Sequence, residues 1–564
     1  MPTTEHLQVD VLVLGGGLAA LRAAVAARQA GASVAVVVKG KLGRSGGSAM
    51  TSGGYAVALP EDDADAADDT PTLHAEDTLR GGGWLGDPRL VRILCDEAPE
   101  RVRELVALGG QLVRDGPRYH RAPSGDHARP RVLQPVHHVG TDLTLPLAQH
   151  AAALGVQALE QTMGLELLAT DGRVLGAICL DTRGGRLLVV QAGAVVLGTG
   201  GCGRLFPVTS NPNDVTGDGY ALAAQAGAEL RDLEFIQFYP WRCVDPFDRA
   251  RVAIQPATFA LGGRLYNRLG ERFMGRYDPE RWEGASRAVG ARAIYDQIRQ
   301  GLDVGGGVRL DLSALDEATF RQANPRVWQG LQVKGIDYRT YPFVVAPEAH
   351  YFMGGVRIDE QGRSSLAGLF AAGEVAGGVQ GANRLDSNAL PETQVFGARA
   401  GRAAAALARD APAATPPREP VARWEAVLAA AAAGGEWSAR ELGALQTELQ
   451  RQMQRSLGIV RDRASMEAGR AYARALRARL EGSGPAGLAS LRPWCELQFL
   501  CDVGELCLTA ALLRTESRGA HYREDYPEQD DPGWRRAVVL RRAPTGEIED
   551  ALLPVDAPLA AGAP

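Results

Sequence analysis

At residues 9–39 the chain reads VDVLVLGGGLAALRAAVAARQAGASVAVVVK, and this stretch decides its fold. The apolar run 11–14 predicts a buried strand, and the alanine-rich run 18–29 after the three glycines predicts a helix. A second apolar run, 34–38, predicts the next strand. Strand, glycine turn, helix and strand in this order form a βαβ unit.

The glycine turn has the spacing of a dinucleotide-binding fingerprint, Gly15-x-Gly17-x-x-Ala20. Gly15 permits the tight turn, Gly17 lets the backbone approach a pyrophosphate, and the small Ala20 lets helix and strand pack closely. The phosphates would lie at the positive end of the helix. The second strand ends in Lys39 where a ribose-binding carboxylate is usual, so the motif alone does not indicate NAD.

Composition sets the outer bounds. A chain of 564 residues is long enough for about three packed units. The formal net charge of -6 and the lack of a dense Lys/Arg run argue against a nucleic-acid partner. No apolar run reaches the roughly 18 residues of a membrane-spanning helix, so we expect a cytoplasmic protein without a transmembrane segment. The seven cysteines have no CxxC spacing, so we expect neither a disulfide framework nor a metal site.

Three further glycine-rich stretches follow the βαβ unit. Residues 43–54 form a loop whose backbone amides suit a flat polar ligand. A buried strand runs into glycines at 194–203, and the stretch 368–374 is a strand that ends in Glu374. Residues 165–189 predict a small meander with turns at Gly172 and at Gly184-Gly185.

With these stretches the chain resembles the family of succinate dehydrogenase and fumarate reductase flavoprotein subunits together with L-aspartate oxidase. The resemblance covers nearly the whole chain. It is carried by 15–20, 44–54, 81–87, 198–203, 216–219, 271–277, 350–355, 371–374, 381–385, 516–521 and 523–527.

The resemblance implies an α/β fold, an FAD-binding Rossmann-like domain with an inserted α+β capping domain and a C-terminal helical domain. We expect the FAD-binding domain at 1–236 and 352–408, the capping (substrate) domain at 237–351, and the helical domain at 421–564 with a disordered tail from 557. The Pro/Ala-rich stretch 410–420 is the expected linker. Periodicity predicts helices at 442–457, 462–480 and 496–514.

The implied cofactor is FAD. Respiratory members carry a histidine that bonds covalently to the flavin, but here the matching position is Gly46 or Gly47, so the resemblance implies non-covalent FAD. The cofactor-binding residues that it implies are Gly15, Gly17, Leu18, Ala19, Ala20, Lys39, Ser45, Gly46, Gly47, Ser48, Gly53, Gly54, Thr199, Gly200, Gly201, Asp218, Glu374, Arg384, Ala389 and Leu390.

The resemblance also places the chemistry. Arg287 matches the arginine that transfers a proton, and His350 and Arg384 match residues that grip one substrate carboxylate. A guanidinium fork and an imidazole donor are suited to that task. Each residue has a structural alternative, an arginine in a surface salt bridge or a histidine in the core.

The other half of the family's site is altered. Tyr239 stands where the second carboxylate-binding histidine is expected, Gln255-Pro256 replaces a Thr-Glu pair, and Phe259 replaces the arginine that follows. The Glu and Arg that relay protons to the catalytic arginine in fumarate reducers are therefore absent from these positions. With Trp241 nearby, this end is aromatic, and we expect a substrate with one carboxylate and a less polar tail. Arg242 and Arg264 are close in sequence and could restore a charge partner.

Three function classes stay open. The first is a flavin-dependent oxidoreductase that moves a hydride between flavin N5 and a carbon next to a carboxylate and exchanges electrons with a partner, such as an iron-sulfur subunit that could also link it to a membrane. The second is an L-aspartate oxidase-like amine oxidase that uses oxygen. The third is a non-catalytic electron-transfer flavoprotein subunit. Substrate identity, direction, electron acceptor and oligomeric state are not encoded in any motif.

Overall fold

The computed structural model describes residues 4–61, 67–124, 126–247, 252–410 and 415–559. Its central sheet has the strand order β7-β2-β1-β10-β9-β8. The long strand β1 (Thr4–Leu14) lies between β2 (Val34–Val38) and β10 (Arg186–Leu197) and is parallel to both. Helix α1 (Leu18–Gln29) connects β1 to β2, which confirms the βαβ unit. Strand β7 (Gln157–Glu160) extends the sheet beyond β2.

The predicted meander is confirmed, with one difference. Strands β8 (Thr162–Thr170) and β9 (Arg173–Asp181) pair antiparallel and turn at Gly172, whose φ is +75°. The third strand of the meander does not end near 189. It continues as β10 to Leu197, where it pairs in parallel with β1 and with β17 (Leu369–Ala371). One apolar strand therefore serves both as the end of the meander and as the strand that enters the second glycine loop.

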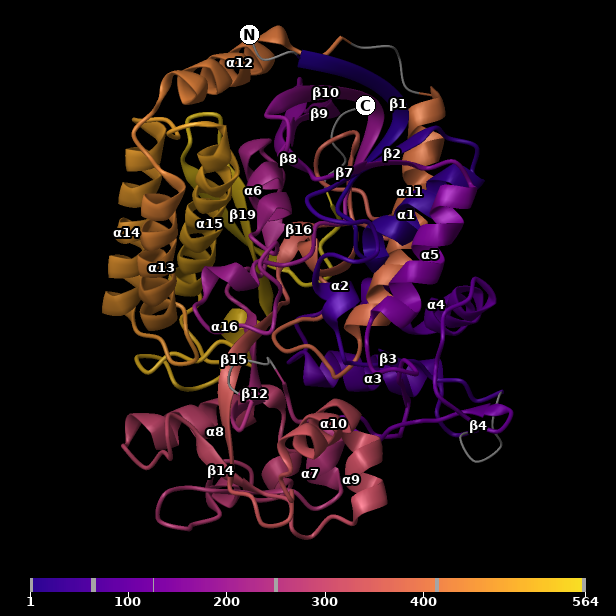
Figure 1. Ribbon diagram of the computed structural model, residues 1–564, viewed down its shortest axis with the longest axis vertical. Coiled ribbons are helices and arrows are strands. Elements are labelled where there is room, and N and C mark those ends of the chain that lie inside the picture. The colour runs from indigo at the N-terminus through magenta and orange to yellow at the C-terminus, as the bar shows by residue number, and fades with distance from the viewer. Residues whose placement is uncertain (1–3, 62–66, 125, 248–251, 411–414, 560–564) are drawn as a thin grey trace.

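Two helices cover one face of the sheet side by side. Helix α11 (Ala389–Asp410) packs along α1. The approach is close, because a Cβ added at Gly401 would lie 2.2 Å from the carbonyl oxygen of Ala23. Around this pair lie α3 (Pro71–Gly81), α4 (Pro88–Ala107) and α5 (Thr141–Ala153), as Figure 1 shows. The first helix of the chain is thus buried between the sheet and a helix almost 400 residues later in sequence.

A separate lobe lies at the bottom of Figure 1. Strands β12 (Ile236–Asp245) and β15 (Phe343–Phe352) run antiparallel between the lobe and the rest of the molecule. They continue into β14 (Val308–Asp311) and β13 (Arg264–Tyr266), in the order β12-β15-β14-β13. The helices of the lobe are α7 (Ala257–Ala260), α8 (Arg287–Arg299), α9 (Glu317–Ala323) and α10 (Pro325–Lys334). The lobe has its own apolar core.

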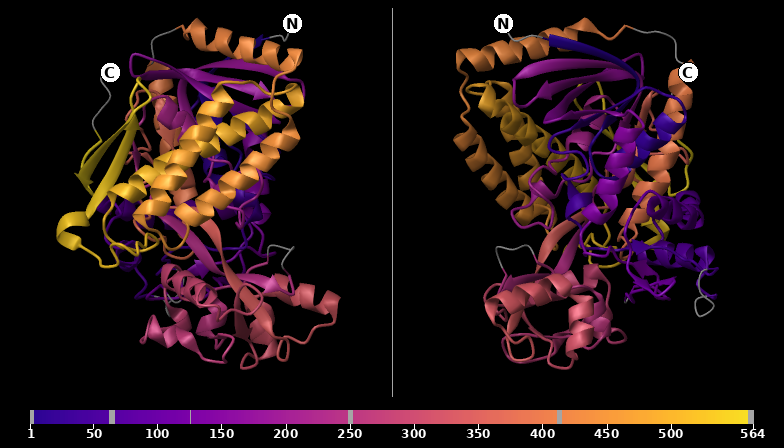
Figure 2. Two further views of the ribbon diagram at one scale, coloured as in Figure 1. Left: turned by 90° about the vertical axis from the view of Figure 1, so that its left-hand side faces the viewer. Right: turned by 45° about the vertical axis from the view of Figure 1, so that its right-hand side comes forward.

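The C-terminal part contains the predicted helices and also a hairpin that the sequence analysis missed. The predicted helices are α13 (Ala439–Ser456), α14 (Arg463–Glu481) and α15 (Leu488–Leu513), which begins eight residues earlier than expected. They are preceded by α12 (Arg418–Ala433), which was not predicted and begins within the expected linker 410–420. The missed hairpin is β19 (Arg536–Arg542) and β20 (Ile548–Pro554). Figure 2 shows it on the outside of the helices.

This hairpin explains how the C-terminal part is attached. Strand β19 pairs with β11 (Leu230–Arg231), which in turn pairs with β16 (Gly355–Arg357), and β16 pairs with β18 (Ala376–Gly377). The fold class is therefore confirmed, with a helical domain that contributes two strands to a shared sheet. The expected linker and the expected tail fall partly on 411–414 and 560–564, outside the described residues. No helix in the described ranges is long and apolar enough to cross a membrane.

A buried ion cluster joins the C-terminal part to the FAD-binding part. Arg514, at the end of α15, donates to Glu234 at 2.6 Å and to Glu516 at 3.0 Å, and all three side chains are fully buried. Removing one partner of such a cluster leaves the others charged and desolvated.

We therefore expect Arg514→Met to lower the free energy of unfolding by about 3–5 kcal/mol, because the buried Glu234 loses its cation and Glu516 keeps only its pair with Arg518 at 2.8 Å. The matched control is Arg541→Met, which removes an exposed pair with Glu549 at 2.7 Å and should cost about 0–1 kcal/mol. Thermal and urea unfolding of both variants measures the difference. Equal small losses would contradict the assigned role of the cluster.

Candidate active site

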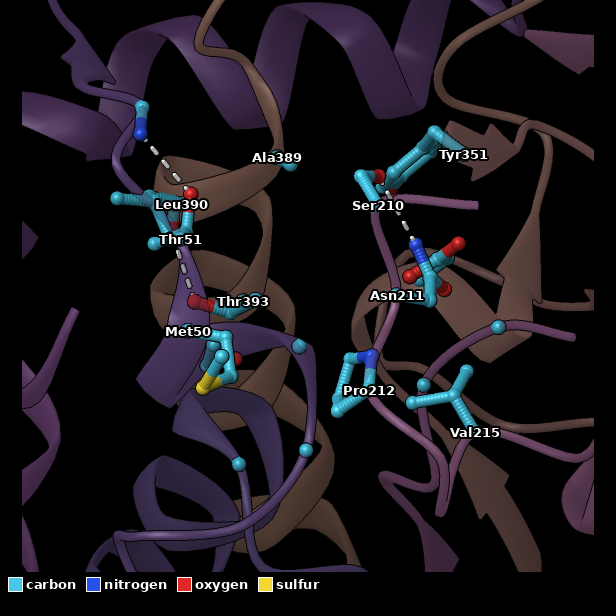
Figure 3. A pocket seen from close by; sticks show the side chains of 18 of the residues that line it. Met50, Thr51, Ser210, Asn211, Pro212, Val215, Tyr351, Ala389, Leu390 and Thr393 are labelled. Carbon is cyan, nitrogen blue, oxygen red and sulfur yellow. Dashed lines mark hydrogen bonds between the residues drawn. The ribbon is translucent and has the colours of Figure 1, made fainter. Parts of the chain in front are cut away.

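A single long cavity runs from the edge of the central sheet to the lobe. It is lined at one end by Val38, Lys39 and Met163, in the middle by the glycine loops, and at the other end by Tyr239, Arg287 and Arg384. Figure 3 shows two of its walls. One carries Met50 and Thr51 together with Leu390 and Thr393, whose hydroxyl donates to the carbonyl of Leu390 at 2.6 Å, and the other carries the segment from Ser210 to Val215.

The βα turn is shaped by the contact between two glycine loops. Gly15 has a φ of +122°, and a Cβ there would lie 2.2 Å from the carbonyl oxygen of Gly198. Ala20 is fully buried against the same Gly198, whose own Cβ would come within 2.9 Å of the Ala20 Cβ. Only glycine and a small residue fit this crossing. The start of α1 consequently opens directly on the cavity at 15–17.

Most residues that the sequence analysis assigned to the cofactor line the cavity. Leu18 and Ala20 do not, since both are buried in the first turn of α1, where the Leu18 amide donates to Ser48 Oγ at 3.2 Å. Those that line it are Gly15, Gly17, Ala19, Lys39, Ser45, Gly46, Gly47, Ser48, Gly53, Gly54, Thr199, Gly200, Gly201, Asp218, Glu374, Arg384, Ala389 and Leu390.

The glycines form a cradle with space for a ligand. A Cβ added at Gly46, Gly47 or Gly200 would meet no protein atom within 4 Å, although all three line the cavity. The hydroxyl of Thr199 is buried and has no hydrogen-bond partner among the described residues. Free backbone surface and an unsatisfied hydroxyl beside a helix N-terminus are what a dinucleotide needs. These residues fit FAD.

Two buried polar groups face the dinucleotide part of the cavity. Lys39 donates from Nζ to Thr216 at 2.7 Å and to Glu496 of α15 at 2.9 Å, so it also ties the C-terminal helices to the cavity. Burial raises the pKa of Glu374 to about 7, against a hydrogen bond from the Phe352 amide at 3.0 Å. A carboxyl group of this kind can either accept from or donate to a hydroxyl group of the ligand at neutral pH.

At the lobe end, Arg287 and Arg384 approach from opposite sides. Arg287 is the first residue of α8, and its Nη2 is paired with the carboxylate of Asp386. Its Nε and Nη1 are buried and have no hydrogen-bond partner within the described residues. Burial lowers the pKa of Arg287, but Asp386 and Asp126 outweigh this and raise the pKa above its ordinary value.

Arg384 belongs to the loop before α11. It donates from Nη2 to Gln237 at 3.1 Å, its guanidinium lies 4.7 Å from the ring centre of Tyr351, and its Nε is a further buried donor without a described partner. Burial and the neighbouring Arg287 lower the pKa of Arg384. The two arginines therefore repel each other in a place where water does not screen them.

His350 completes this group. Its Nδ1 lies 2.8 Å from Ser210 Oγ, whereas the same hydroxyl is 3.5 Å from the carbonyl of Ala349. A proton donated by Ser210 to Nδ1 leaves Nε2 as the donor of a neutral ring. The pKa of His350 is lowered well below its ordinary value by burial and by the two arginines, which keeps the imidazole neutral.

The opposite wall differs from what the sequence analysis expected. Tyr239 and Gln255 line the cavity, but Trp241 and Phe259 lie behind them in the core of the lobe, where their rings are 4.3 Å apart. The hydroxyl of Tyr239 donates to the carbonyl of Ile254 at 2.5 Å, so this residue presents its ring rather than a free polar group. Arg242 and Arg264 do not line the cavity.

Other charged residues line the cavity that the sequence analysis did not single out. Arg326 of α10 is exposed at the rim, and Glu348 is the cross-strand neighbour of Tyr239. Asp386 was missed as well. The available signal was a carboxylate two residues after Arg384 in the stretch GANRLDSN, close to a residue already assigned to the site.

Known proteins resemble this chain in sequence and in overall fold. A family model described as "FAD binding domain" matches residues 10–390, and one described as "Fumarate reductase flavoprotein C-term" matches 446–557. The chain is 40% identical to a subunit of the fumarate reductase (CoM/CoB) of Methanothermobacter marburgensis, over 96% of this chain and 98% of that protein. It is 38% identical to the L-aspartate oxidase of Caulobacter vibrioides, over 94% and 96%. A structure of FrdA of E. coli quinol fumarate reductase aligns with a TM-score of 0.89 at 27% identity and covers 99% of both chains.

The crossing of the two glycine loops yields a prediction for FAD content. In Gly15→Ala the new Cβ collides with the Gly198 carbonyl, and we expect the purified variant to carry less than about a tenth of the wild-type FAD, a loss of about 1.4 kcal/mol or more in binding. The control is Gly31→Ala, whose φ of +92° is also positive but whose Cβ meets nothing within 4 Å.

FAD is quantified after acid precipitation, where we expect the wild type to release all of it into the supernatant because Gly46 and Gly47 offer no side chain for a covalent bond. Full FAD content in Gly15→Ala would contradict the role of the Gly15–Gly198 crossing in FAD binding. Flavin retained in the wild-type pellet would contradict non-covalent attachment.

Proposed function

The chain belongs to the family of fumarate reductase and succinate dehydrogenase flavoproteins and L-aspartate oxidase and is an FAD-dependent oxidoreductase, and from this premise we propose the reaction that it catalyses. It transfers hydrogen across a carbon–carbon bond next to a carboxylate. The substrate carries one carboxylate at the reacting end and a less polar group at the other.

The observation that carries this proposal is the set of buried donors without a partner. Arg287 Nε, Arg287 Nη1 and Arg384 Nε belong to two different elements and line the same end of the cavity. Leaving a charged donor buried and unsatisfied is costly, so the site is built for an anion that accepts from both arginines. A planar carboxylate matches two guanidinium groups, and the neutral His350 adds a further donor.

The chain's residues have distinct tasks in the reaction. When bound, FAD supplies or accepts the hydride at the carbon next to this carboxylate. Arg384, His350 and one of the two unpaired nitrogens of Arg287 hold the carboxylate, and the other unpaired nitrogen of Arg287 remains for proton transfer. Besides the hydride, the reduction needs one proton. A guanidinium held against a reacting carbon in a desolvated site can donate this proton, which is the role that we assign to Arg287.

The opposite wall supports a substrate with a single carboxylate. It offers the ring of Tyr239, the amide of Gln255, which donates to Ser52 Oγ at 3.2 Å, and the carboxylate of Glu348. None of these groups is a cation, so a second carboxylate there would be desolvated without a partner. The cation at the rim, Arg326, is exposed to solvent.

A second candidate rests on sequence similarity. An oxidase acting on a carbon–nitrogen bond is favoured by the likeness to an L-aspartate oxidase over almost the whole chain. Such an enzyme hands its electrons to oxygen, whereas the first candidate needs an electron-transfer partner. For the first candidate we propose an iron-sulfur partner protein, because all seven cysteines of the chain are buried and unpaired and the described residues hold no cluster of metal ligands. Release of hydrogen peroxide on addition of an amino acid substrate separates the two.

The substrate class is tested anaerobically. The flavin of the purified protein is reduced stoichiometrically, and crotonate, cinnamate, fumarate or iminosuccinate is then added while the flavin absorbance is followed. We expect a monocarboxylic enoate to reoxidise the flavin at roughly one per second or faster. Fumarate should be at least about tenfold slower. A tenfold difference corresponds to about 1.4 kcal/mol, which is a small part of the cost of burying an unpaired carboxylate.

Arg326→Ala provides the matched variant in this test. It should leave reoxidation by the monocarboxylic enoate unchanged. Faster reoxidation by fumarate than by the enoates, with loss of that rate in Arg326→Ala, would instead show that the rim cation holds a second carboxylate. Silence toward all four compounds would favour a non-catalytic electron-transfer role.

The role of Arg287 is tested separately. Arg287→Ala removes the proton donor and should slow reoxidation by about 100-fold or more, with unchanged FAD content. The control is Arg292→Ala on the same helix, whose guanidinium lies 4.6 Å from the ring centre of Tyr522, outside the cavity. Equal rates in the two variants would remove Arg287 from the mechanism.

A further inference from the structure

We propose that Asp386 is the proton-exchange partner of Arg287 and that, with Asp126 and His127, it connects the active site to solvent through the FAD-binding part instead of through the lobe. The inference rests on the proposed function, because it supplies the proton that Arg287 delivers to substrate. It makes Asp386 a positioning and proton-relay residue, one that acts through Arg287.

The first support is the direct contact. Asp386 Oδ1 is paired with Nη2 of Arg287, and the two side chains are 13% and 6% exposed. This hydrogen bond leads from the Arg287 side chain to an acid. Nη2 of Arg287 is thus bound to an acid, whereas its Nε and Nη1 have no partner among the described residues and are available to a substrate in the cavity. A proton that leaves on the substrate side can be replaced from the other side.

The second support is what stands behind Asp386. Its backbone amide donates to Asp126 Oδ2 at 3.0 Å, and its carbonyl lies 2.8 Å from His127 Nε2. Asp126 also accepts from Ser124 Oγ at 2.8 Å. Asp126 and His127 are half-buried, and the next residues, Ala128 and Arg129, are exposed. Two titratable side chains therefore adjoin the backbone of Asp386, and exposed residues begin directly after them in the sequence.

The third support is the state of the lobe side. The positions at which the resemblance expects an acidic and a basic relay group carry Pro256 and Phe259, and Gln255 precedes them. Gln255 is engaged with Ser52 at 3.2 Å, and Phe259 packs on Trp241 at 4.3 Å. None of these side chains can carry a proton at neutral pH. Asp386 contacts Arg287 directly, as a relay group must, but it belongs to the FAD-binding part and not to the lobe.

The charged groups that face Asp386 define its chemistry. They are Arg287 from α8, Arg384 from its own loop, and Asp126 and His127 from the loop before Arg131. Burial raises the pKa of Asp386, but Arg287, His127 and Arg384 outweigh it and hold the pKa below its ordinary value. The carboxylate is consequently ionised at rest and Arg287 is protonated, so each catalytic cycle starts with the proton on the arginine.

The proton balance is simple. Reduction of a carbon–carbon double bond adds one hydride, which is the contribution of the reduced flavin, and one proton. An N–H bond of Arg287 breaks as the new C–H bond forms, and the arginine is left neutral. One proton from solvent, entering on the side of Asp126 and His127, then binds to the Asp386 carboxylate and passes from it to the neutral Arg287, which restores both groups. Oxidation of the product runs the same steps in reverse.

The test uses the FAD-loaded full-length chain and the first of crotonate, cinnamate and fumarate that reoxidises the wild type. In Asp386→Asn the amide oxygen still accepts from Arg287 but cannot carry a proton. We expect a single reoxidation of pre-reduced flavin within about threefold of wild type, because Arg287 starts protonated. Steady-state turnover with reduced methyl viologen should fall by about 100-fold, with KM within about threefold and a larger solvent deuterium isotope effect.

Two further variants separate a relay from a structural ion pair. Asp386→Glu restores an acid and should recover steady-state turnover to within about tenfold of wild type. Asp126→Asn, farther from Arg287, should slow turnover by a smaller factor and shift its pH profile. If Asp386→Asn does not fold or does not hold FAD, Asp126→Asn carries the test with the same readouts.

Several results would overturn the inference. One is equal loss in single and multiple turnovers of Asp386→Asn, which marks a purely structural role. Another is normal turnover in Asp386→Asn together with a raised isotope effect in Glu348→Gln, which moves the relay to the other carboxylate that lines this end of the cavity. If fumarate is the sole acceptor, the proposed substrate class is wrong. The role of Asp386 is then still tested by comparing wild type and Asp386→Asn with fumarate as the acceptor. Silence of the wild type toward every acceptor contradicts both.

Discussion

Two buried guanidinium groups at one end of the same cavity set the constraint on which the rest of this structure depends. Arg384 comes from the loop before α11 in the FAD-binding part, and Arg287 comes from the first turn of α8 in the lobe. Burial and Arg287 lower the pKa of Arg384, whereas at Arg287 the carboxylates Asp386 and Asp126 outweigh burial and raise the pKa. An anion between them would reduce the repulsion and satisfy the free donors of both, which come from the lobe and from the FAD-binding part.

The nucleotide half of the site depends on a different constraint, the close contact of backbones. Gly15 and Gly198 touch because β1 and β10 are neighbours in the sheet and both lead into glycine loops. The same crowding recurs where α11 passes over α1 at Gly401. Small residues at these crossings bring the start of α1, the loop at 199–201 and the start of α11 around one cavity. Lys39, bonded to Glu496, extends this arrangement to the C-terminal helices.

Acid–base chemistry in the site is distributed by burial. His350 is kept neutral beside two arginines, Glu374 has its pKa raised to about 7, and Asp386 remains ionised because cations surround it. In the proposed reaction the three groups have different tasks within one cavity: a neutral donor to the substrate carboxylate, a hydroxyl partner for the cofactor and a proton-exchange partner for Arg287. Their environments, and not their residue types, separate these roles.

The sequence by itself determined the βαβ unit, the meander and the order of the glycine loops, because each depends on local periodicity or on a short motif. The family resemblance pointed to Arg287, His350 and Arg384, and all three line the cavity. The sequence did not predict β19 and β20, since their partner β11 lies about 300 residues earlier and no local pattern specifies that pairing. Tertiary structure alone decided that Trp241 and Phe259 lie behind Tyr239, that Arg264 is outside the cavity, and that Asp386 is the partner of Arg287. Which way a side chain points, and which charge it meets, follows from the packing of elements distant in sequence, and that information is absent from any single stretch of the chain.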